Sequence, residues 1–124
     1  PVFQMCWEDL IGVWKFPSAE DPSGYGWFVF TEDGRFFRAV YDDWQRKHIP
    51  MRNRVSVESP NELCFRGAIN RGIGSGVTHG CWFVGESLLL TNLRGAYICT
   101  RVREEEVPGW FLSERESAFA SWPS

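Results

Sequence analysis

The sequence predicts an all-β fold: an eight-stranded antiparallel up-and-down β-barrel with a short N-terminal turn and a C-terminal helical segment. Three observations predict it. Strand-like runs of apolar, aromatic and β-branched residues recur along the chain. No strong helical pattern separates any two of these runs, which argues against parallel crossovers. A chain of 124 residues also fits one domain, so residues 1–124 are expected to form a single barrel.

The first elements lead into a central hairpin. Residues 7–11, WEDLI, predict a helical turn that brings Trp7 and Leu10 to the core. Residues 12–16 predict a first strand, which Pro17 ends. The aromatic-rich stretch from 24 to 42 then predicts two strands, at about 25–31 and 35–41, folded around Asp33-Gly34.

The loop lengths predict a barrel with one open end. A long polar connection, 42–53, is expected before the remaining strands, which lie at about 54–58, 62–67, 78–84, 87–91 and 96–103. In a meander the tight turns at 33–34, 60–61 and 85–86 share one end. The longer loops after Phe16, Tyr41 and Gly67 share the other end. We therefore expect a pinched end and an irregular mouth, as in barrels that hold a ligand.

The C-terminal segment predicts an amphipathic helix. Ser113 and Glu116 have capping-box spacing, so the helix is expected to begin there. One stripe would carry Phe111, Arg115, Ala118, Phe119 and Trp122. This stripe could cover an apolar patch on the barrel wall or form a homodimer contact.

The turn of the central hairpin decides which residues line the cavity. With a two-residue loop, Asp33-Gly34, the side chains of Phe28 and Phe30 share a face with those of Phe37, Ala39 and Tyr41. With a three-residue loop, 32–34, and a glycine bulge, Tyr25, Trp27 and Val29 share that face instead. We favour the bulged turn, with that face inside. The residues then expected to bind a ligand are Tyr25, Trp27, Val29, Phe37, Ala39, Tyr41, His79, Trp82 and Tyr97.

The segment Leu10-Ile11-Gly12-Val13-Trp14 resembles the N-terminal Gly-x-Trp motif of the lipocalin-like, or calycin, superfamily of small β-barrels. The resemblance implies that Trp14 plugs the closed end and that an arginine of the last strand, Arg101 or Arg103, stacks on it. The family's Thr-Asp-Tyr is absent between the sixth and seventh strands, where residues 84–86 read Val-Gly-Glu, and we find no secretory signal. A compact intracellular lipocalin-like domain therefore fits better than a secreted carrier.

Two arginines within the strands bear on the ligand. An inward-pointing Arg38 or Arg66 would be a buried cation that favours an acidic headgroup, as in fatty-acid carriers of the calycin type. We expect Arg38 to point outward, because its neighbours Phe37 and Ala39 belong to a face without charge.

Three functions are compatible with these residues. The first is binding of a small, largely hydrophobic molecule in the barrel cavity. The second is a cofactor-independent enzyme, such as an isomerase, cyclase or dehydratase, in which His79 acts with Tyr41 or Asp43. The third is a protein-interaction or inhibitor module with a filled core.

Composition argues against several partners. The net charge of -3 disfavours nucleic acid, and no apolar run is long enough to predict a membrane span. The four cysteines lack Cys-x-x-Cys spacing and are expected as reduced thiols of a cytoplasmic protein.

No metal or other cofactor is expected. His48 and His79, with Asp42 or Asp43, are the candidate metal ligands, but the two histidines lie in different segments. The glycine-rich residues 72–76 lack the Lys-Ser/Thr of a phosphate-binding loop and are interpreted as a flap over the mouth.

Overall fold

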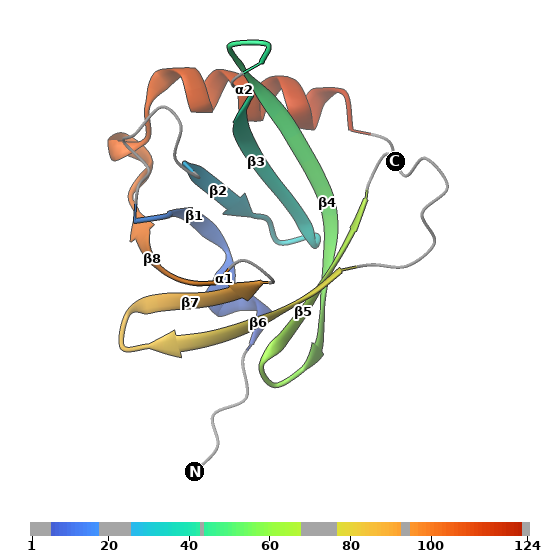
Figure 1. Cartoon of the computed structure of the whole chain (residues 1–124), viewed down its shortest axis with the longest axis vertical. Helices are drawn as coiled ribbons and strands as arrows, with labels where there is room; N and C mark the ends of the chain where they lie inside the picture. The colour runs from blue at the N-terminus through green and yellow to red at the C-terminus, as the bar shows by residue number, and fades with distance from the viewer. Residues whose placement is uncertain (1–5, 18–25, 43, 68–76, 93–94, 123–124) are drawn as a thin grey trace.

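A computed structural model of the chain describes residues 6–17, 26–42, 44–67, 77–92 and 95–122. Eight antiparallel strands form a closed barrel in which each strand pairs with its neighbours in sequence and β8 pairs with β1 (Figure 1). The predicted fold class is therefore confirmed. The elements in order are α1 (Trp7–Leu10), β1 (Gly12–Lys15), β2 (Trp27–Phe30), β3 (Arg35–Asp42), β4 (Lys47–Ser59), β5 (Glu62–Gly67), β6 (Val77–Val84), β7 (Ser87–Asn92), β8 (Gly95–Val102), η1 (Glu104–Glu106) and α2 (Gly109–Ala120).

The β2–β3 hairpin has the three-residue loop that we favoured. Val29 pairs with Phe37 and Phe30 with Phe36, and the Thr31 amide donates to the Arg35 carbonyl at 3.0 Å. The loop is therefore 32–34, and its last residue is a glycine with φ of 81°, a conformation that costs glycine little.

The face that we assigned to the cavity, however, lies outside the barrel. Trp27, Val29, Phe37 and Ala39 form a cluster with residues of α2 that include Phe111. The side chains on the opposite face of the hairpin, Phe28, Phe30 and Phe36, belong to the interior cluster. Both faces of this hairpin are apolar, so alternation alone could not tell them apart. Helix α2 covers the outer face of the hairpin and shields it from water. This is one of the two roles that we expected for the C-terminal stripe.

Helix α2 begins earlier than predicted. Its first residue is Gly109, and Pro108 precedes it with φ of -59°. Proline pre-sets this angle for a helix start, so Ser113 lies inside the helix and not at its N-cap. The apolar residues of the stripe pack as expected: Phe111 and Ala118 are buried, and Phe119 packs 6.2 Å from Phe37 between ring centroids.

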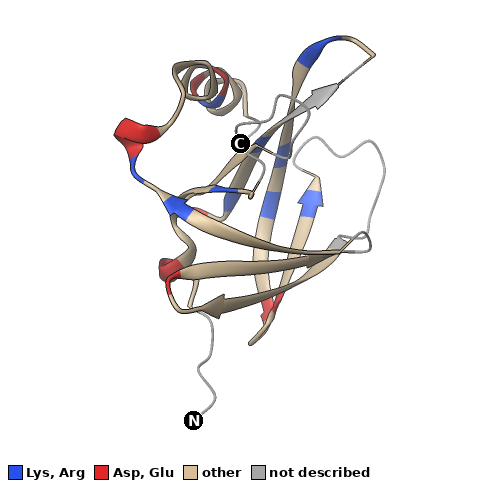
Figure 2. Ribbon diagram, turned by 60° about the vertical axis from the view of Figure 1, so that its left-hand side comes forward, with Lys and Arg blue, Asp and Glu red and all other residues tan. Residues whose placement is uncertain are grey.

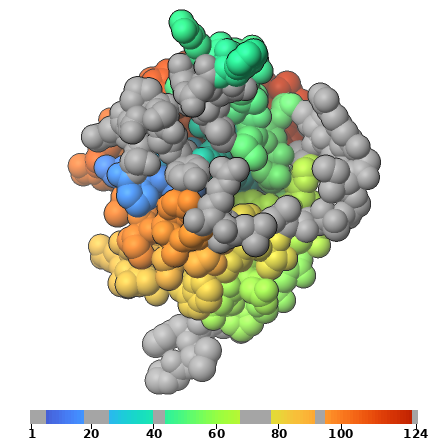
Figure 3. Space-filling view, viewed as in Figure 1, coloured from blue at the N-terminus to red at the C-terminus, as the bar shows by residue number. Residues whose placement is uncertain are grey.

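The polar connection expected over 42–53 is largely strand. Strand β4 begins at Lys47, and its pairing with β3 runs out to Asp42. The prediction of a long loop after Tyr41 was wrong, because polar residues can form a ladder where the two-stranded ribbon is exposed. Figure 3 shows the tip of this hairpin standing out beyond the body of the molecule. Trp44 near the tip is 94% exposed.

The half of the barrel next to α1 is filled by side chains. Seven of its core residues have almost no exposed surface: Trp14, Phe28, Phe30, Leu63, Cys81, Leu88 and Cys99. Helix α1 closes this end, because Leu10 is fully buried and Trp7 packs edge-on against Phe30. Among the described residues, neither α-helix has the length and apolarity that crossing a membrane requires.

Candidate functional site

The open half of the barrel holds a cavity of about 240 Å³. Strands β3 to β8 contribute to it, with Phe16 just after β1, and four of the lining side chains are phenylalanine or tyrosine: Phe16, Phe36, Phe65 and Tyr97. The polar side chains that line it are Arg38, Asn53, His79 and Thr91, and the remaining lining residues are Met51 and Leu90. A largely aromatic wall with a few polar groups is the usual composition of a small-molecule site.

Arg38 points into this cavity. It stands across the β2–β3 ladder from Phe28, which is fully buried inside the barrel, and directly paired residues share a face. The guanidinium carbon lies 4.9 Å from the centroid of the Phe16 ring, and the Nη2 atom is buried. Our expectation that Arg38 points outward was wrong, because its neighbours Phe37 and Ala39 occupy the face beneath α2.

Arg66, the other strand arginine, lies on the surface. Its Nη1 donates to Ser56 Oγ at 2.9 Å and its Nη2 pairs with Glu58 Oε1 at 3.1 Å. The side chains of Arg66 and Glu58 are about half exposed, so this pair is worth little to stability.

His79 is the histidine that the structure places in the cavity. It stands opposite the buried Leu63 on β5, so it faces inward. Its Nδ1 lies 3.1 Å from the carbonyl oxygen of Thr91, and its ring meets Phe65 edge-on, with the centroids 4.9 Å apart. Two contacts on adjacent strands thus fix the orientation of the imidazole.

Of the other residues predicted to bind ligand, only Tyr97 is placed in the cavity. Its ring meets Phe16 edge-on at 5.7 Å between centroids. Trp82 alternates with the buried Cys81, is 40% exposed, and lies over Gly80 on the outer surface, where a Cβ on that glycine would clash with the indole. Trp27, Val29, Phe37 and Ala39 lie under α2, as described above. Tyr25, Asp43 and the side chain of Tyr41 lie outside the described residues, as do residues 72–76.

The two histidines do not come together. His48 stacks on Trp110 of α2, with 4.0 Å between the ring centroids, while His79 is inside the barrel. In the part of the chain that the structure describes, no group of three potential metal ligands occurs.

Several lining residues were missed from the sequence, namely Phe16, Phe36, Arg38, Met51, Asn53, Phe65, Leu90 and Thr91. Two of them, Phe36 and Arg38, were missed because the face of the hairpin was inverted. The sequence did contain a signal that the face with Phe37 and Ala39 packs against a helix. Ala39 is small, and a small side chain lets a helix pack closely on a sheet.

Cys81, two residues from His79 on the inner face, cannot serve as a nucleophile here. Burial raises the pKa of its thiol to about 12, and the nearby Cys99 adds to the shift. Burial also raises the pKa of Cys99 to about 12, against a smaller opposing effect of Arg38. Both thiols therefore stay protonated near neutral pH. None of the four cysteines forms a disulfide; Cys6 is exposed and the other three are buried.

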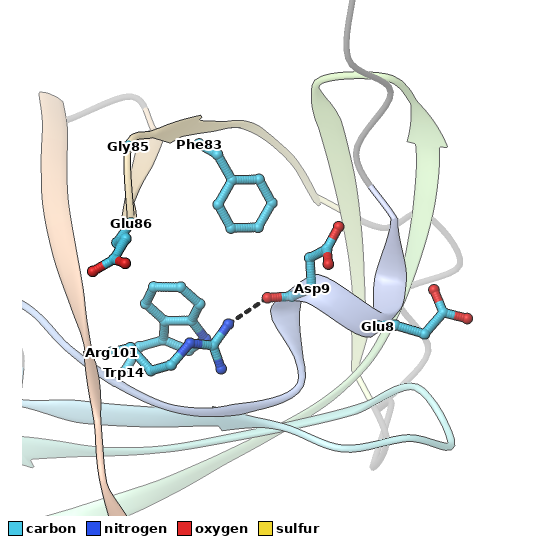
Figure 4. A pocket seen from close by; sticks show the side chains of 7 residues that line it. All are labelled: Glu8, Asp9, Trp14, Phe83, Gly85, Glu86 and Arg101. Atoms are coloured by element: carbon cyan, nitrogen blue, oxygen red, sulfur yellow. Dashed lines mark hydrogen bonds between the residues drawn. The ribbon is translucent and has the colours of Figure 1, made fainter.

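The closed end carries a second, wider hollow of about 640 Å³ (Figure 4). Glu8, Asp9, Phe83 and Glu86 line it, together with Trp14 and Arg101. The Arg101 guanidinium lies over the Trp14 ring and donates to the carbonyls of Ile11 and Asp9. The Arg101 guanidinium already contacts Trp14 and two backbone carbonyls. We therefore take the smaller aromatic cavity as the candidate site.

No protein-family model matches this chain, and no curated protein matches its sequence significantly.

Proposed function

We propose that the protein is a lipocalin-like barrel that binds a small, largely apolar molecule bearing an anionic group. One observation carries this proposal: Arg38 places a guanidinium among the aromatic rings of the cavity. A guanidinium beside apolar rings favours an anionic ligand, because the attraction between opposite charges is screened less there than in water. The planar guanidinium also matches a carboxylate with two parallel hydrogen bonds.

The volume of the cavity limits the size of the ligand. Sites for drug-sized molecules usually measure about 300–1,000 Å³, and this cavity is smaller, at about 240 Å³. The core beneath it is packed with fully buried side chains such as Phe28 and Leu88. A compact aromatic acid fits these limits better than a long-chain fatty acid.

Binding of naphthoate and of its neutral amide, measured by calorimetry, tests the proposal. The wild type should prefer the acid. Arg38→Met should weaken naphthoate binding by about ten- to hundredfold, as expected for a hydrogen bond to a charged group, and leave the amide almost unchanged. Arg66→Met, on the surface of β5, is the matched control. Equal loss in the two variants, or no preference for the acid, would refute the proposal.

A second candidate is a cofactor-independent enzyme that uses the same cavity. It is favoured by the presence of His79 and Tyr97, two groups capable of proton transfer, among the lining residues. Incubating the protein with bound aromatic acids that carry an exchangeable carbon-bound proton, and following deuterium incorporation by NMR, distinguishes the two. Exchange that disappears in His79→Phe would favour the enzyme.

A further inference from the structure

Among the described residues, His79 has one ring nitrogen in a hydrogen bond and one without a hydrogen-bond partner. Its Nδ1 lies 3.1 Å from the backbone oxygen of Thr91. A carbonyl oxygen can only accept, so Nδ1 must carry the proton of this hydrogen bond. In the neutral imidazole Nε2 then holds a lone pair and is an acceptor. The local geometry thereby selects one tautomer.

The available nitrogen belongs to a ring that is held in the cavity. His79 faces inward opposite Leu63, and the edge contact with Phe65 restrains its rotation. Within the described part of the chain, the hydrogen bond of His79 is the one made by Nδ1. A ligand in the cavity that carries a donor group can therefore reach an acceptor of fixed orientation.

We propose that His79 is a second anchor for the ligand, accepting a hydrogen bond through Nε2 from a hydroxyl group on an aromatic acid. This inference rests on the proposed function and adds the class of ligand. Arg38 favours the anionic group and His79 favours a donor, so the site selects hydroxylated acids over simple acids and over their methyl ethers. A methyl ether keeps the oxygen but has no proton to donate.

The experiment compares naphthoate, a series of hydroxynaphthoate isomers and their methyl ethers by calorimetry at one fixed pH. In the wild type, at least one hydroxynaphthoate should bind about two- to tenfold more tightly than its methyl ether, the range for a neutral hydrogen bond. His79→Phe should remove that preference and keep the preference for the acid over the amide. His79→Gln, whose amide reaches the position of Nε2, should restore part of it.

A second measurement needs no variant. Heteronuclear NMR of the imidazole nitrogens should show the proton on Nδ1 in the free protein and a shift of the Nε2 signal when a hydroxynaphthoate binds. A proton on Nε2 in the free protein would overturn the inference. So would a preference for hydroxyl over methoxy that is absent in the wild type or unchanged in His79→Phe.

Failure of this inference and failure of the proposed function give different results. If His79 is not an anchor, acids still bind through Arg38 but without discrimination between hydroxyl and methoxy groups. If the site does not bind acids, naphthoate binding is absent or insensitive to Arg38→Met, and both proposals are overturned together.

Discussion

Arg101 covers the indole of Trp14 at the closed end of the barrel, with the guanidinium carbon 4.3 Å from the ring centroid. The indole Nε1 donates to the Leu10 carbonyl at 2.9 Å, and Arg101 Nη1 donates to the Ile11 carbonyl at 2.7 Å. The first and last strands are therefore tied to helix α1 through one stacked pair. Arg103, the alternative candidate, instead pairs with Glu106 at 2.6 Å. Figure 2 shows this basic end of β8 leading into the acidic turn η1.

Arg101→Met should destabilise the barrel by about 2 kcal/mol, because it removes a cation–π contact and charge-assisted hydrogen bonds to the backbone. Urea denaturation followed by circular dichroism measures the change. Arg103→Met is the matched control, since its side chain is 75% exposed and its ion pair should contribute less than about 1 kcal/mol. Equal effects of the two substitutions would show that the stacked pair does not close the barrel.

Gly12→Ala should also destabilise the closed end. The glycine has φ of +124°, and an added Cβ would lie 2.9 Å from Arg101 Nη1. Backbone strain of this kind costs about 1–3 kcal/mol, and Arg101 would have to move as well. Gly109→Ala at the start of α2, where a Cβ meets nothing within 4 Å, should be neutral or stabilising by up to about 1 kcal/mol. The comparison of the two midpoints in urea tests this, and a neutral Gly12→Ala would contradict it.

Local chemistry predicted the hairpin loop but not its facing. Gly34 marks the end of the turn, because its φ of 81° favours glycine, and the three-residue loop was the one that we favoured. Facing depends on what covers each side of the sheet, and here both sides are apolar. The interior position of Arg38 followed from that facing, and so it was missed. His79 and Tyr97 were found because strand ends at a mouth place polar rings there.

The boundaries failed for related reasons. The Ser113–Glu116 spacing matched a helix start. The helix begins earlier, directly after Pro108, and burial of Phe111 stabilises the additional turn. Residues 47–53 of β4 are mostly polar and carry no regular alternation of apolar and polar side chains, so they were taken for a loop. Such features depend on tertiary contacts that a local pattern does not contain.

Two substitutions in α2 test the corrected helix start. Ser113→Ala would cost about 1 kcal/mol if Ser113 were an N-cap, but in the helix interior it should be neutral or slightly stabilising. Phe111→Ala should cost about 3–5 kcal/mol, because Phe111 is fully buried against Phe37. Thermal unfolding measures both. A costly Ser113→Ala would support the original capping assignment.

Cysteine reactivity should follow burial. At pH about 8, thiols with a pKa of about 12, as for Cys81 and Cys99, are thiolate in about one part in ten thousand. Cys64 is buried and Cys6 is exposed. Native protein treated with iodoacetamide should therefore carry a single modification, at Cys6, by mass spectrometry of peptides, and denatured protein should carry four. Rapid native labelling of Cys81 would show that the barrel interior opens.

Acid should weaken the contact between η1 and α2. Arg115 donates to both carboxylate oxygens of Glu104, at 2.7 and 3.0 Å, and these hydrogen bonds hold the pKa of Glu104 below its usual value of 4.5. A lowered folded-state pKa means that the stabilisation is fully present above pH 4.5 and is lost as pH falls through the folded-state pKa. Because the Glu104 side chain is 62% exposed, we expect at most about 1 kcal/mol.

Urea midpoints between pH 7 and pH 3 provide the measurement for Glu104. The wild type should lose more stability on acidification than Glu104→Gln, and the two curves should converge at the acidic end, where the carboxylate of the wild type is protonated. Glu105→Gln is the neighbouring control, because Glu105 lies 3.7 Å from Arg103 in a pair whose side chains are mostly exposed. On acidification this variant should lose as much stability as the wild type. Parallel curves for Glu104→Gln and wild type would show that the Arg115 contact does not contribute in solution.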